Sequence, residues 1–114
     1  MKLKEIIQLT NARLVTGNDT ETDEIVKAFS SDLMSDALTL DADHILLISG
    51  LANVQLIRTA EMADVAAVLL ARGKKASPEM IEMTDRAGLI ILETPFSLFR
   101  ASGVLYANGM CPVY

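Results

Sequence analysis

The sequence predicts an α/β protein in which three layers, α/β/α, are arranged around a mostly parallel sheet built from short βα units. Two observations lead to this fold class. Short runs of consecutive apolar residues alternate along the chain with segments of helical periodicity, and the apolar runs show no regular polar alternation. This is typical of strands that helices cover on both faces of a parallel sheet. The length of 114 residues predicts one domain, 1–114.

The N-terminal third is expected to contain a helix, two strands and a short helix. Residues 2–9 place apolar side chains along one helical stripe, and residues 13–15 form a short extended segment. A strand is expected at 25–30, after which Ser31 caps a short helix. The polar run 18–24 is expected to be a solvated loop. Its carboxylates leave calcium binding open, although their spacing is not that of an EF-hand.

The remainder of the chain repeats the order strand, then helix, three times. Ser77 followed by Pro78 marks one helix start, and Thr94 followed by Pro95 marks another. Gly88 stands where a glycine ends a helix. The predicted strands are 44–49, 65–70 and 89–92, and the predicted helices are 53–62, 78–87 and 95–107.

Composition restricts the class of protein. The formal net charge of -5 and the pI near 4.7 argue against a nucleic-acid partner, which would require clustered positive charge. The chain has no apolar stretch of signal-peptide or membrane-span length, which predicts a cytoplasmic protein with no membrane partner. Hydrophobic residues make up 51% of the chain, and such a high share favours an apolar interface and a homodimer.

The candidate ligand site lies at the carboxyl ends of the three predicted parallel strands, where open α/β sheets bind ligands. Each strand end leads toward a helix N-terminus, which favours an anion. The candidate ligand-binding residues are Ser49, Gly50 and Leu51 in the first loop, Arg72, Gly73 and Lys74 in the second, and Thr94 and Pro95 in the third.

The second loop lies within the stretch LLARGKKASPEM, residues 69–80, which has a glycine–lysine pair between a strand and a helix. A true P-loop needs a glycine five positions before that pair and a serine or threonine after it. Val68 and Lys75 occupy those positions, so the sequence argues against a nucleotide triphosphatase. The stretch is interpreted as a helix-start turn that attracts an anion, or as a solvated turn in which Gly73 has a positive φ.

The sequence predicts no catalytic residues, no metal site and no cofactor. His44 is the only histidine and lies at the opposite strand end from the candidate loops, and Cys111 has no histidine to activate it. An enzyme that uses Arg72, Lys74 or Thr94 is kept as a third hypothesis, although it lacks a nucleophile, base and orienting group.

From Ile45 onward the sequence resembles the DRTGG domain family. The resemblance follows the order of strands and helices and includes Ser77-Pro78-Glu79 and Glu93-Thr94-Pro95-Phe96; residues 12–38 are compatible with the N-terminal half of the family. This family is similar to the N-terminal domain of HPr kinase/phosphorylase. Residues 49–52 stand where a Gly-Asp-Arg-like loop is expected, and residues 71–74 where Thr-Gly-Gly is expected.

The resemblance implies a regulatory or dimer-forming module rather than a catalytic unit. The leading hypothesis is a non-catalytic, homodimeric, ligand-sensing module that binds a small anionic ligand or a nucleotide at the strand-end loops. The alternative is a homodimeric adaptor or accessory protein for a metabolic or redox enzyme, for example in a hydrogenase system, with no small ligand.

Overall fold

The centre of the molecule is a six-stranded sheet with the strand order β1-β5-β4-β3-β2-β6. The computed structural model describes residues 1–17, 24–37, 39 and 43–114. Strand β1 pairs antiparallel with β5, and every other neighbouring pair is parallel, which confirms the mostly parallel sheet. The strands are β1 (Arg13–Thr16), β2 (Lys27–Ser30), β3 (Ile45–Ser49), β4 (Ala67–Leu70), β5 (Ile90–Glu93) and β6 (Cys111–Pro112).

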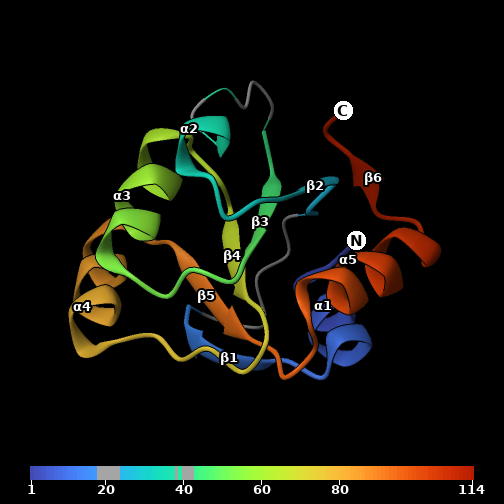
Figure 1. Ribbon diagram of the computed structural model, residues 1–114, viewed down its shortest axis with the longest axis horizontal. Helices are drawn as coiled ribbons and strands as arrows, with labels where there is room; N and C mark the ends of the chain where they lie inside the picture. The colour runs from blue at the N-terminus through green and yellow to red at the C-terminus, as the bar shows by residue number, and fades with distance from the viewer. Residues whose placement is uncertain (18–23, 38, 40–42) are drawn as a thin grey trace.

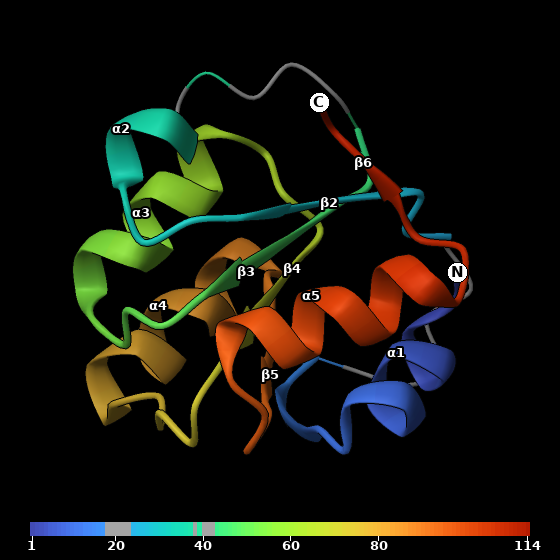
Figure 2. The ribbon, with the colours of Figure 1, turned by 45° about the vertical axis from the view of Figure 1, so that its right-hand side comes forward.

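Helices cover both faces of this sheet, which confirms the three-layer prediction. Helices α2, α3 and α4 lie on one side of the sheet and α1 and α5 on the other (Figures 1 and 2). No helix of the described residues is long and apolar enough to cross a membrane. The helices are α1 (Leu3–Thr10), α2 (Met34–Ala37), α3 (Val54–Met62), α4 (Pro78–Ala87) and α5 (Leu98–Ala107).

Two apolar cores, one on each face of the sheet, hold the layers together. Successive residues of a strand point to opposite faces, so Leu47 of β3 joins the core under α3 and α4, while Leu46 joins the core under α1 and α5. All five residues of β3 and all four of β4 are buried. Burial on both faces is the physical reason why these strands have no polar alternation in the sequence.

The ends of α4 follow the prediction, whereas the start of α5 does not. Ser77 Oγ accepts a hydrogen bond from the backbone N–H of Met80 at 3.2 Å, and Gly88 ends α4 with φ of 71°. The predicted start of α5 at Thr94 and Pro95 is wrong, because the helix begins at Leu98 and Ser97 is its N-cap.

Two other details differ from the sequence-based prediction. Helix α2 begins at Met34, and Ser31 Oγ accepts from Leu33 N at 2.9 Å in the turn before it. Strand β6 was not predicted; its Cys111 pairs with Lys27 of β2 at the edge of the sheet. A two-residue strand is too short to show any periodicity, so only pairing with β2 reveals it.

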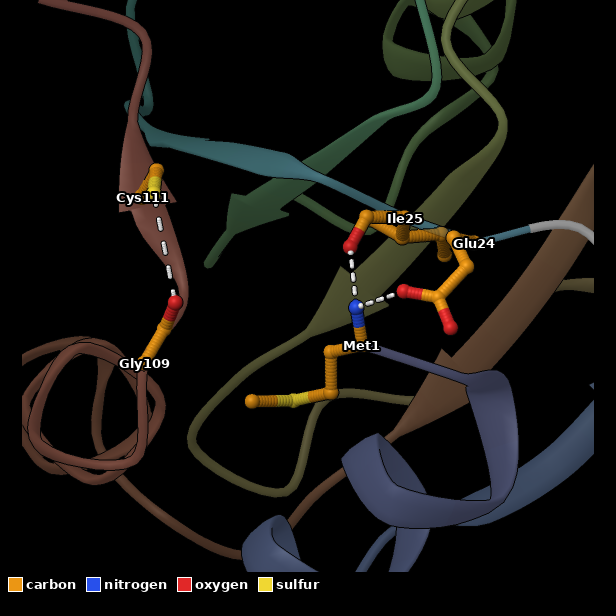
Figure 3. A network of polar contacts seen from close by, with 5 residues as sticks. All are labelled: Met1, Glu24, Ile25, Gly109 and Cys111. Atoms are coloured by element: carbon orange, nitrogen blue, oxygen red, sulfur yellow. Dashed lines mark hydrogen bonds and ion pairs between the residues drawn. The ribbon is translucent and has the colours of Figure 1, made fainter.

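The start of α1 is connected to the segment that enters β2. The amino group of Met1 donates to Glu24 Oε2 and to the backbone carbonyl of Ile25, both at 2.9 Å (Figure 3). The hydrogen bond and the positive charge of this amino group hold the pKa of Glu24 below its usual value.

Figure 3 also shows the exposed Cys111, whose Sγ lies 3.9 Å from the carbonyl oxygen of Gly109.

Candidate functional site

The three predicted loops lie together at one edge of the sheet, where β3, β4 and β5 end. Backbone hydrogen bonds connect each loop to the next: Ala71 N–H donates to Ser49 O, and Thr94 N–H donates to Leu70 O, both at 2.9 Å. Gly73 N–H donates to Thr94 O at 2.9 Å and so joins the second loop to the third. The structure therefore brings all eight candidate residues to the carboxyl edge of the sheet.

The second loop is a tight turn whose backbone donors face inward. Arg72 and Gly73 have positive φ angles of 59° and 70°, and Lys74 N–H donates to Ala71 O at 3.2 Å, as in a type I′ turn. Arg72 N–H donates to Phe96 O at 2.6 Å. Because the N–H groups of Arg72, Gly73 and Lys74 are all used within the protein, an anion at this turn would meet side chains instead of backbone donors.

The first loop is occupied by a carboxylate of the protein itself. Asp32 Oδ1 accepts from Gly50 N–H at 2.6 Å and from Ser49 Oγ at 3.0 Å. The hydroxyl of Ser49 also accepts from Leu51 N–H at 3.2 Å. Two donors that would suit an anionic ligand are therefore already paired with Asp32.

The third loop is a structural connection between α1, β5 and α5. The buried hydroxyl of Thr94 donates to the carbonyl of Thr10 and accepts from Phe96 N–H at 3.1 Å. Phe96 lies before α5 and not inside it, and the guanidinium of Arg100 sits 3.8 Å from the centre of its ring. The Thr94 hydroxyl thus already acts as both donor and acceptor, while Pro95 is exposed.

A buried carboxylate, Glu93, anchors the segment that follows the second loop. Its Oε2 accepts from Ala76 N–H at 2.7 Å, and its Oε1 lies 2.6 Å from Arg13 Nη2 and 3.6 Å from Lys75 Nζ. Burial alone would raise the pKa of Glu93. The hydrogen bonds from Ala76 and Arg13, with the charges of Arg13 and Lys75, outweigh burial and lower it.

Two of the eight candidate residues, Arg72 and Lys74, are cations. Both side chains are exposed, and neither has an ion-pair partner among the described residues. Lys75 differs from them because it lies near the carboxylate of Glu93. The positive potential of the second loop is therefore carried by two side chains from one turn, next to the loop that Asp32 occupies.

Two cavities in the described part of the molecule lie away from these eight residues. The first, about 590 Å³, is at the opposite end of the sheet, where His44, Asp64 and Gly88 are among the lining residues. The second, about 440 Å³, is a groove between α5 and the strands β2 and β6, with Phe99 and Tyr114 among its lining residues. None of the eight candidate residues therefore lines either of these two cavities.

Sequence reasoning missed Asp32 as a member of this edge, and it placed Glu93 at the strand end without finding its role there. Asp32 falls in the short helix that is expected after Ser31, although its place two residues after β2 already puts it at the carboxyl edge. Glu93 ends β5, and its role depends on Arg13, which β1 places opposite it. The position of Asp32 was a usable signal in the sequence, whereas the pairing of Glu93 with Arg13 across 80 residues was not.

No arrangement of three or more His, Cys, Asp or Glu residues suited to a metal ion occurs in the part of the chain that the structure describes. The polar run for which calcium binding was left open falls largely outside that part, because residues 18–23 are not among the described residues.

Comparison with known proteins yields a likeness in fold. No protein-family model matches the chain, and no curated protein matches it. A solved structure does match: the CBS and DRTGG domains of the regulatory region of Clostridium perfringens pyrophosphatase, crystallised with its activator diadenosine tetraphosphate. The TM-score is 0.79 at 18% sequence identity, over 98% of this chain and 48% of that chain.

The fold is shared. The present chain spans about half the length of that regulatory region, and at 18% identity the likeness concerns the path of the backbone. This agrees with the resemblance to DRTGG domains at the level of fold, and membership of that family stays a prediction.

Proposed function

We propose that the chain is a non-catalytic regulatory module that forms a homodimer and senses a small anionic ligand, a nucleotide, at the carboxyl edge of its sheet. The observation that carries this proposal is the fold it shares over 98% of its length with a regulatory region that binds a nucleotide activator. The hydroxyl groups of Ser49 and Thr94 support a non-catalytic role, because both are engaged within the protein.

Arg72 and Lys74 are the residues that support an anionic ligand. They are exposed on one turn at the edge where parallel α/β sheets bind ligands. Guanidinium and ammonium groups recognise phosphate through charge-assisted hydrogen bonds. The other five candidate residues lie in the first and third loops. In this proposal they shape the site, while the two cations bind the phosphate. These residues are Ser49, Gly50, Leu51, Thr94 and Pro95.

The groove between α5 and β6 is proposed as the homodimer interface. Its fourteen lining residues include no Asp, Glu, Lys or Arg. At its rim the side chains of Phe99, Tyr106 and Tyr114 are exposed by 89%, 69% and 78%. Two chains of net charge -5 repel each other. This repulsion is smallest where the two chains meet through uncharged faces, so the groove suits a second copy.

The ligand proposal is tested by thermal denaturation with a panel that contains inorganic phosphate, pyrophosphate, AMP, ADP, ATP and diadenosine tetraphosphate. A nucleotide at about 100 times its Kd should stabilise the folded chain by about 2.7 kcal/mol. That stabilisation should raise the Tm of a chain of 114 residues by about 10 °C. The double substitution Arg72→Ala, Lys74→Ala should abolish the increase, since it removes the two exposed cations.

The matched control is Lys4→Ala with Arg58→Ala, which removes two exposed cations from α1 and α3. This control should keep the ligand-dependent increase. A panel without any increase in Tm, or an increase that survives in the Arg72 and Lys74 double variant, would contradict the ligand proposal.

The adaptor hypothesis remains the second candidate, since the apolar groove also supports a protein interface without a small ligand. It predicts capture of one specific enzyme in a pull-down, unchanged by Arg72→Ala with Lys74→Ala, together with no response to the ligand panel. The ligand-sensing proposal instead predicts that the panel raises the Tm.

A further inference from the structure

Asp32 is an exposed carboxylate that the protein holds in a fixed position at the carboxyl edge. It follows β2, and both of its hydrogen bonds come from the loop after β3: Gly50 N–H at 2.6 Å and Ser49 Oγ at 3.0 Å. Both reach Oδ1. Within the described residues, Oδ2 accepts no hydrogen bond, and a carboxylate oxygen has the capacity for further donors.

The same loop separates Asp32 from the cations of the second loop. Ser49 contacts Asp32 through its side chain, and its backbone carbonyl accepts from Ala71 N–H at 2.9 Å, one residue before Arg72. Neighbouring strands lie about 4.8 Å apart, so the ends of β2 and β4 are separated by roughly 10 Å. The edge therefore presents a hydrogen-bond acceptor on one side and two cations on the other.

A ligand that fits this edge carries an anion at one end and neutral hydrogen-bond donors at the other. A nucleoside phosphate has this character, with phosphate oxygens for Arg72 and Lys74 and sugar hydroxyl or base amino groups for Asp32. A simple polyanion such as pyrophosphate does not, because it has no neutral donor for Asp32 and its charge is repelled by the carboxylate.

We propose that Asp32 is a specificity-determining residue of the strand-end site: it accepts a hydrogen bond from the sugar or base of a nucleoside phosphate and disfavours purely anionic ligands. This inference rests on the proposed nucleotide-sensing function and adds to it the orientation of the ligand. The phosphate end lies over the loop after β4, and the nucleoside end lies over the loop after β2.

The test compares the affinities of ADP and pyrophosphate for the wild-type chain and for Asp32→Ala, measured by calorimetry. Loss of a hydrogen bond to a charged acceptor should weaken ADP binding roughly 10-fold to 100-fold. Pyrophosphate should bind equally well or more tightly, because the opposing charge is gone. Asp36→Asn, at an exposed acid in α2, is the control and should change neither affinity by more than about twofold.

Asp32→Asn serves as a second variant if Asp32→Ala does not fold, since its side-chain oxygen can still accept from Gly50. It should remove the repulsion, because an amide is neutral, and so tighten pyrophosphate relative to ADP. Equal changes for both probes, or tighter binding of both, would overturn the role of Asp32. If neither probe binds the wild-type chain, the proposed nucleotide function fails and this inference fails with it. If binding is lost with Arg72→Ala and Lys74→Ala but is insensitive to Asp32, only the inference fails.

Discussion

At the scale of single residues, Glu93 shows how a buried charge is made stable. Glu93 is 4% exposed, and an unpaired charge at such a site would be costly. Arg13, Lys75 and the N–H of Ala76 together provide the compensation. Because the folded-state pKa lies below the ordinary value of 4.5, the ionised form stabilises the fold above that pH, and this stabilisation is lost as the pH falls through the folded-state pKa.

Glu93→Gln should therefore destabilise the chain by about 1–3 kcal/mol at pH 7, since it removes the charge that Arg13 and Lys75 face. The difference from wild type should shrink as the pH falls below about 4. Urea denaturation at pH 7 and at pH 3.5 measures both effects.

The control for this prediction is Glu82→Gln, which breaks the exposed ion pair with Arg86 on α4. It should change stability by less than about 0.5 kcal/mol at either pH, because exposed ion pairs contribute little. A Glu93→Gln variant as stable as wild type at pH 7 would argue against the proposed balance of charges.

At the scale of elements, the start of α5 depends on a competition between two side chains. Thr94 and Ser97 are both good N-cap residues, but the hydroxyl of Thr94 donates to the carbonyl of Thr10 and accepts from Phe96 N–H in the turn before the helix. Ser97 Oγ accepts from Arg100 N–H at 3.0 Å instead, so the helix begins three residues later than the sequence pattern indicates.

Ser97→Ala should lower the free energy of unfolding by about 1 kcal/mol, because the first turn of α5 loses its side-chain acceptor. Ser97→Asp keeps an acceptor there and adds a negative charge at a helix N-terminus, so it should restore wild-type stability. Urea denaturation of the two variants tests this assignment. Equal stability of Ser97→Ala and wild type would show that another residue caps α5.

At the scale of the whole molecule, the prediction concerns assembly. Light scattering on the wild-type chain should give twice the chain mass of 12.3 kDa at micromolar concentration. Phe99→Ser with Tyr106→Ser should give the monomer mass without loss of folded stability, because both side chains are exposed in the single chain.

Met62→Ser on α3 provides the matched control. Met62 is a large apolar residue, 76% exposed, that does not line the groove between α5 and β6, so its loss should leave the dimer intact. A wild-type chain that is monomeric, or a dimer that survives the Phe99 and Tyr106 double variant, would refute the proposed interface.

The fold class and most elements could be predicted from the chain alone, because their causes are local. Helix α4 carries its own start in Ser77 and Pro78 and its own stop in Gly88. Strand β4 consists of apolar residues throughout, and β3 is apolar up to its last residue, Ser49, which is the direct result of burial on both faces. The carboxyl edge of the sheet was predictable for the same reason, since it follows from the order of strands and helices.

Only the tertiary structure decided which polar groups at that edge are available to a ligand. Asp32 pairs with the loop after β3, Glu93 with Arg13, and Thr94 with Thr10, and each pair joins segments that are far apart in the sequence. Periodicity and capping signals depend on neighbours within a few positions, so they determine helices and strands. Hydrogen bonds across the sheet depend on which strands become neighbours, and that is settled only when the two apolar cores pack.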